Sequence, residues 1–116
     1  MNNKLSRRAL GVAVGLTVIL GGWAAQAADI SGNYRVNGRN PNGSAYNGSV
    51  QIVDNNGAIA MSWQVGTSYS GVGRIEGRVL TVEWGSTDPV IYVINRDGTL
   101  YGTWAKGKAL ELLTPR

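Results

Sequence analysis

Hydrophobic and polar residues alternate along most of the chain after residue 28, and turn residues return about every 8 to 12 positions. Strict alternation places successive side chains on opposite faces of an extended strand, whereas an amphipathic helix repeats its apolar positions every three or four residues. The chain after residue 28 lacks the helical repeat. The pattern predicts short strands at residues 32–37, 44–53, 58–65, 68–76, 78–84, 90–95, 99–104 and 108–113.

The connections between these segments are short and rich in turn-forming residues, such as Asn55-Asn56-Gly57 and Asp97-Gly98. Asn-Gly and Asp-Gly tolerate the positive φ angles that tight hairpins need. Strands joined by such turns pair with the next strand along the chain, and closing the resulting sheet removes its unpaired edges. We therefore predict an all-β fold, a small antiparallel meander barrel of about eight strands, with a small β-sandwich as the alternative.

The same alternation predicts which side chains point inward. Most strands carry one large aromatic residue on the face that also holds their aliphatic residues, and these residues are Tyr46, Trp63, Tyr69, Trp84, Tyr92 and Trp104. Residues 90–94, VIYVI, are apolar on both faces, which predicts a strand that is central or covered. Glu83 and Glu111 alternate with apolar neighbours, and we assign both to the solvent face.

Two interpretations of the six aromatic residues stay open. They either fill the barrel as its core, with their N–H and O–H groups bonded to backbone or water, or line a small cup for an apolar or aromatic ligand at one mouth. A barrel of eight strands is just wide enough for side chains to fill it. The six residues are the candidate ligand-binding site.

A short repeat supports the barrel geometry. Residues 43–50, GSAYNGSV, match residues 66–73, GTSYSGVG, in residue type, and residues 98–104, GTLYGTW, form a looser third copy. In the first two copies a tyrosine and a glycine stand two positions apart and so share a face. Glycine within a strand is typical of a sharp bend or of a site where a ring lies across bare backbone.

The first 27 residues differ in kind from the rest. Lys4, Arg7 and Arg8 precede an uncharged apolar run at residues 9–22, and Ala25-Gln26-Ala27 follows it. This order is that of a secretory signal with its cleavage site, and the run is short for a membrane-spanning helix. We predict a signal peptide at 1–27 and one β-barrel domain at 28–116, located in the periplasm or secreted. An uncleaved anchor is the alternative, and the Arg7-Arg8 pair leaves open whether export uses the twin-arginine or the general route.

Removal of the signal changes the charge of the protein. The full chain has 11 Lys and Arg against 7 Asp and Glu, and the signal carries three of the basic residues and none of the acidic ones. The remaining domain has a net charge of about +1 and no basic cluster, which argues against nucleic-acid binding. The chain has no Cys, so the domain must be stable without disulfides.

The residue types that most catalytic sites need are absent. Without His or Cys, the chain has no Ser-His or Cys-His nucleophile pair, and nearly every kind of zinc, copper or haem site is excluded. Asp54, Asp88 and Asp97 lie in predicted turns, where their side chains have an ordinary turn role. We expect no enzyme activity, no metal and no cofactor.

Most of the domain resembles one group of proteins. The runs ADISGNYRVNGRNPNGSAYNGSVQI (28–52), W-x-V-G-x-x-Y-x-G-x-G (63–73), LTVEWG (80–85), PVIYVINRDGTLYGTWAKG (89–107) and LELLTP (110–115) are similar to those of short exported proteobacterial proteins, which sometimes carry the label "fibronectin-binding protein". The resemblance implies an exported β domain of unassigned function, and the label would imply adhesion to host matrix.

Two weaker resemblances concern single segments. Residues 97–104, DGTLYGTW, resemble a strand of avidin-type barrels, which implies a calycin- or avidin-like barrel without the biotin-contacting set. Residues 31–34, SGNY, together with Tyr101 and Lys106-Gly107, resemble motifs of periplasmic lysozyme inhibitors. We predict an exported, non-catalytic binding protein for a small molecule or peptide, with a protein-interaction module, an inhibitor or adhesin, as the alternative. The sequence predicts no stable membrane anchor after cleavage and leaves the oligomeric state open.

Overall fold

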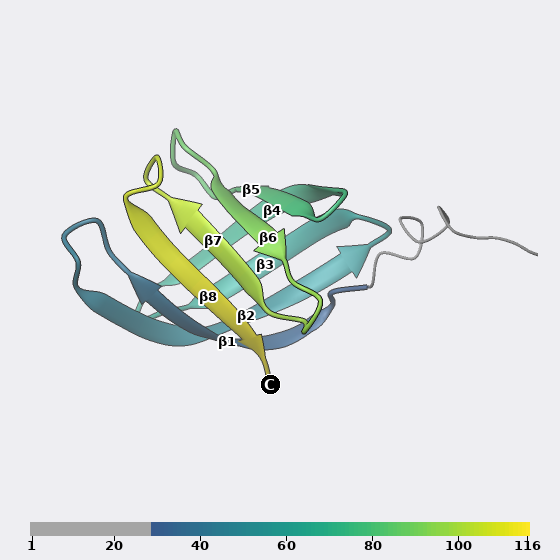
Figure 1. Ribbon diagram of the computed structural model, residues 1–116, viewed down its shortest axis with the longest axis horizontal. Helices are drawn as coiled ribbons and strands as arrows, with labels where there is room; N and C mark the ends of the chain where they lie inside the picture. Colours follow the sequence, from purple (N-terminus) through teal and green to yellow (C-terminus); the bar gives the residue numbers. More distant parts are fainter. Residues whose placement is uncertain (1–28) are drawn as a thin grey trace, which may run out of the picture.

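The alternating segments fold as eight antiparallel strands in the computed structural model, which describes residues 29–116 (Figure 1). The strands are β1 (Gly32–Arg39), β2 (Ala45–Asn55), β3 (Ala58–Gln64), β4 (Ser68–Glu76), β5 (Val79–Glu83), β6 (Val90–Ile94), β7 (Leu100–Trp104) and β8 (Ala109–Pro115). The predicted signal peptide lies outside the described residues. Within residues 29–116 there is no helix long and apolar enough to cross a membrane.

Each strand pairs with its neighbours in sequence, and β1 also pairs with β8, so the sheet closes on itself. The predicted meander barrel is confirmed, and the sandwich alternative is wrong. The eighth strand begins one residue later and ends two residues later than predicted, because Thr114 and Pro115 pair with Arg35 and Tyr34 of β1. Closure therefore uses residues at both ends of the described chain.

The predicted turn at Asn55-Asn56-Gly57 shows why the strands follow one another so closely. Asn56 and Gly57 have φ angles of 55° and 88°, the left-handed values that a two-residue hairpin needs and that Asn and Gly adopt most readily. The Gly57 N–H donates to Asp54 Oδ1 at 2.8 Å. Asp54 thus has the turn role that the sequence predicts for it.

One end of the barrel is closed by the chain that leads into β1. Ile30 is buried against the core, and its carbonyl accepts a 2.6 Å hydrogen bond from Tyr34 Oη. Its N–H donates to Asp54 Oδ2 at 3.0 Å. The aliphatic core, including Ile52, Leu80 and Leu113, therefore fills the barrel beside this closed end.

The outer face of β6 differs from the prediction. Ile91 and Val93 are nearly half exposed, so the strand is neither central nor covered by any part of residues 29–116. A single-layer barrel buries only its inward side chains, and here these are Val90 and Tyr92. Val93 is flanked on the outer face by Val79 and Tyr101, which are also exposed.

Candidate functional site

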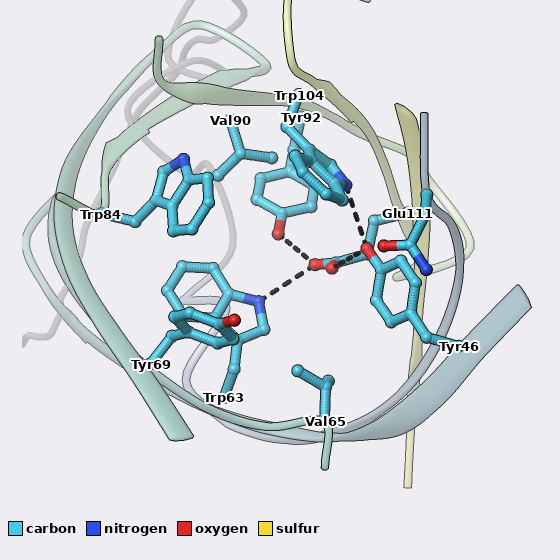
Figure 2. Close-up of a pocket in the computed structure, with 10 residues that line it drawn as sticks. Tyr46, Trp63, Val65, Tyr69, Trp84, Val90, Tyr92, Trp104 and Glu111 are labelled. Atoms are coloured by element: carbon cyan, nitrogen blue, oxygen red, sulfur yellow. Dashed lines mark hydrogen bonds between the residues drawn. The ribbon is translucent and has the colours of Figure 1, made fainter. Parts of the chain in front are cut away.

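The six predicted aromatic residues all line one pocket of about 190 Å³ at the end of the barrel opposite Ile30 (Figure 2). This end is formed where β1, β3, β5 and β7 finish, since alternate strands of a meander run in the same direction. The pocket residues that come from these strand ends or directly after them are Asn40, Val65, Trp84 and Trp104. Tyr69 is 42% exposed, so the pocket reaches solvent at its rim.

Glu111 on β8 lies inside the pocket, not on the solvent face where the sequence analysis placed it. Its side chain is only 5% exposed, as befits a position that alternates with the outward Leu110 and Leu112. β8 has apolar residues on both faces, so the alternation of its sequence alone does not decide which face is buried. The assignment of Glu111 to solvent relied on its charge and is wrong.

The carboxylate of Glu111 accepts hydrogen bonds from three aromatic side chains (Figure 2). Tyr46 Oη donates to Oε1 at 2.7 Å, and Trp63 Nε1 donates to Oε2 at 3.0 Å. Tyr92 Oη also donates to Oε2. An indole N–H can only donate and an ionised carboxylate can only accept, so the arrangement is that of a carboxylate held by neutral donors.

A second indole determines the direction of the Tyr46 bond. Trp104 Nε1 donates to Tyr46 Oη at 3.0 Å, which leaves the phenolic hydrogen of Tyr46 to point at Glu111. The Trp84 Nε1 instead donates to the backbone carbonyl of Asp88 at 3.1 Å. All three indole N–H groups of residues 29–116 thus have partners, as buried tryptophans require.

Two glycines allow both tyrosines to reach the carboxylate. Glu111 pairs with Gly38 of β1 on one side and with Gly102 of β7 on the other. Beyond them, Tyr46 of β2 is opposite Gly38 and Tyr92 of β6 is opposite Gly102. A Cβ atom at either glycine would overlap the ring opposite, so each ring lies across bare backbone and brings its hydroxyl to Glu111. Ring-over-glycine packing, one of the two roles expected of glycines within these strands, therefore builds this site, although Gly38 lies outside the repeat.

Edge-to-face contacts join four of the rings along the pocket. Tyr69 and Trp84 lie 5.6 Å apart between ring centroids, Trp84 and Trp104 lie 5.8 Å apart, and Trp104 and Tyr46 lie 6.2 Å apart. The interplanar angles are between 70° and 83°, the geometry that aromatic quadrupoles favour. These contacts hold the rings in fixed positions around the opening.

The charge of Glu111 is not neutralised by a basic group within the pocket. Among the residues of the described chain that line it, Glu111 is the one that carries a formal charge. Burial, and then the Glu111 charge, raise the pKa of the Tyr92 hydroxyl well above its ordinary value of 10.0. The same two causes, in the same order, raise the pKa of Tyr46. Both phenols are therefore neutral donors at physiological pH.

These raised pKa values predict a loss of stability in alkali. A group that binds its proton more tightly when folded stabilises the fold below its unfolded pKa, here about 10, and loses that effect as pH rises towards its folded pKa. We expect the free energy of unfolding, measured by denaturant titration, to fall steadily above about pH 10. Tyr92→Phe should weaken this dependence, whereas Tyr101→Phe, on the outer face, should retain it. An unchanged dependence in Tyr92→Phe would contradict the assignment.

The site has no features of a metal centre. No group of three or more Asp, Glu, His or Cys side chains comes together within residues 29–116. Asp97 accepts hydrogen bonds from the N–H and Oγ1 of Thr99, so its side chain has a turn role, as the sequence predicts. Glu111 is a single carboxylate with neutral partners.

Four lining residues were not predicted from the sequence: Glu111, Asn40, Val65 and Val90. One signal pointed to Glu111. The inward tryptophans and tyrosines carry N–H and O–H donors that need acceptors when buried, and one carboxylate can accept from several of them. Of the three glutamates within predicted strands, only Glu111 shares its parity with the inward residues of its own strand, here Leu113.

Comparison with known proteins supports the fold alone. No family model matches the chain, and no curated protein matches it. Among solved structures, a redesigned β-barrel is similar, with a TM-score of 0.55 and 14% sequence identity, over 75% of this chain and 91% of that one. An all-β barrel is the conclusion that this similarity allows.

Proposed function

We propose that this chain is an exported, non-catalytic binding protein that holds a small molecule in the aromatic pocket at the open end of the barrel. The observation that carries the proposal is the cavity of about 190 Å³ walled by six aromatic rings and reaching solvent at Tyr69. A barrel whose rings merely completed the core would leave no such space, because protein interiors are packed with few voids larger than water.

The pocket volume sets the size of the ligand. An apolar cavity of about 150 Å³ is known to hold benzene, so this pocket suits a body of roughly one ring with a short substituent. A peptide would have to be bound through one side chain. The closed end, filled by Ile30 and the aliphatic core, supports entry from the rim of the pocket.

Two features support binding without catalysis. The pocket holds one carboxylate, and acid–base hydrolysis of the glycosidase type uses two. Its other polar groups are tyrosine hydroxyls, indole N–H groups and the Asn40 amide, which suit recognition. The same proposal places the protein in the periplasm or outside the cell, because residues 1–27 have the pattern of a secretory signal. It also includes kinship with the short exported proteobacterial proteins, because the sequence resembles theirs.

The test compares two tyrosines of similar exposure. Tyr69 is 42% exposed and lines the pocket, whereas Tyr101 is 45% exposed and lies on the outer face of β7. Full-length protein is expressed in its native host, purified without unfolding, and weighed by native mass spectrometry. We expect a reproducible small-mass adduct on the wild type and on Tyr101→Ala, and a several-fold lower occupancy on Tyr69→Ala.

Both substitutions remove a partly exposed ring, so each should cost only about 1 kcal/mol of stability or less. A difference in adduct occupancy between them therefore reports on the pocket and not on folding. If the wild-type protein carries no adduct and takes up no small molecule of any charge, the proposed function is wrong.

A further inference from the structure

We infer that the ligand is a small organic cation, a protonated amine on an apolar body of about one ring, which donates to Oε1 of Glu111. The inference rests on the proposed function, because it assigns the chemistry of a ligand in that same pocket. Three independent features of the pocket carry it: its net charge, a free acceptor position, and its aromatic walls.

The charge of the pocket is negative and has no counterion among residues 29–116. Tyr46, Trp63 and Tyr92 solvate the Glu111 carboxylate with hydrogen bonds, but all three are neutral, and no Lys or Arg lines the pocket. A buried charge of this kind is stabilised further by a cation that reaches it. An anionic ligand would be repelled by the same charge at close range.

One acceptor position on the carboxylate remains available. The two oxygens of a carboxylate offer about four lone-pair positions. Trp63 and Tyr92 occupy both positions on Oε2, whereas among the side chains of residues 29–116 Oε1 accepts only from Tyr46. Glu111 lines the pocket, with its carboxylate among the other lining side chains (Figure 2), and we therefore expect Oε1 to lie within reach of a ligand N–H. A charged N–H donor to a carboxylate makes a shorter and stronger hydrogen bond than a neutral donor.

The walls of the pocket favour the same sign of charge. Aromatic faces are negative at their centres and attract cations, most strongly in sites removed from water. The indoles of Trp63, Trp84 and Trp104 line the same pocket as Glu111 and are held there by their hydrogen bonds and ring contacts. Carboxylate and rings together select an ammonium group with an apolar body.

The experiment uses three probes of one shape and different charge. Benzylammonium, benzyl alcohol and benzoate are titrated separately into full-length protein at neutral pH, with binding followed by calorimetry and by tryptophan fluorescence. We expect benzylammonium to bind at least about tenfold more tightly than benzyl alcohol, and benzoate to bind most weakly. This comparison needs no variant, so it stands even if changes at Glu111 impair folding.

A charge-neutral variant tests the role of Glu111. Glu111→Gln retains the shape of the side chain and should reduce the preference for benzylammonium over benzyl alcohol to about twofold or less. Glu83→Gln removes the same charge from an exposed position on β5 and should leave the preference unchanged. A preference that persists in a folded Glu111→Gln variant would overturn the assignment.

The remaining outcomes separate this inference from the proposed function. If benzyl alcohol or benzoate binds the wild type as tightly as benzylammonium does, the pocket binds ligands but not as a cation site, and only the inference fails. If none of the probes binds and native mass spectrometry finds no adduct, the proposed function fails and the inference with it.

Discussion

Replacing Glu111 with leucine is expected to lower the free energy of unfolding by about 3–5 kcal/mol, because three donors lose their acceptor together. Each unsatisfied buried donor costs about 1–3 kcal/mol, and Tyr92 and Trp63 are almost wholly buried. Tyr46 is half buried, so its hydroxyl can donate to water in the pocket instead, which lowers the cost of losing Glu111. A domain of this size has a total stability of only about 5–15 kcal/mol, so the change removes a large share of it.

Glu111→Gln is the matched variant and should cost only about 1 kcal/mol. The amide oxygen accepts from Trp63 and Tyr92, and the amide nitrogen donates to the Tyr46 hydroxyl, whose oxygen has a second lone pair beside the one that Trp104 uses. Denaturant unfolding followed by tryptophan fluorescence measures both variants, with Glu83→Leu as a surface control. Equal stability of Glu111→Leu and wild type would mean that water satisfies the three donors.

The fold is predictable here because alternation and turn chemistry agree in nearly every segment. In β3, the buried Ile59, Met61 and Trp63 alternate with exposed neighbours, and the Asn56-Gly57 turn before the strand fixes the register of its pairing with β2. The ends of the strands are less predictable. Pro115 belongs to β8 only because Tyr34 of β1 lies opposite it, and a local pattern does not show a partner about 80 residues away.

The sequence predicts the aromatic residues of the site but not its carboxylate. Parity places the six rings on the inward face, and closure of the barrel then brings them to one pocket. Glu111 escapes this reasoning because a charge is usually on the surface, and because β8 reads as apolar on both faces. The burial of Glu111 depends on a row of paired residues that crosses five strands: Tyr46, Gly38, Glu111, Gly102 and Tyr92. This row includes the pairing of β1 with β8, so it exists only once the barrel has closed.

That row leads to the second large effect, at Gly102. Gly102→Ala is expected to lower the free energy of unfolding by about 2–3 kcal/mol, although the substitution adds only one methyl group. The new Cβ would overlap the ring of Tyr92 and would lie 3.0 Å from the backbone oxygen of Ile91. Tyr92 is completely buried and lies directly opposite Gly102, so its ring must move, and the movement takes its hydroxyl away from Glu111. Denaturant unfolding measures the loss of stability.

A double-mutant cycle separates this cause from a general intolerance of alanine at Gly102. In a Tyr92→Leu background the ring is absent, so Gly102→Ala should cost clearly less than it does in the wild type. Because the displaced ring also carries a donor to Glu111, the single variant should weaken benzylammonium binding as well. An additive cycle would place the strain in the backbone of β7. Coupling between the two positions would instead mean that the bare backbone at Gly102 is what holds the Tyr92 hydroxyl against the carboxylate.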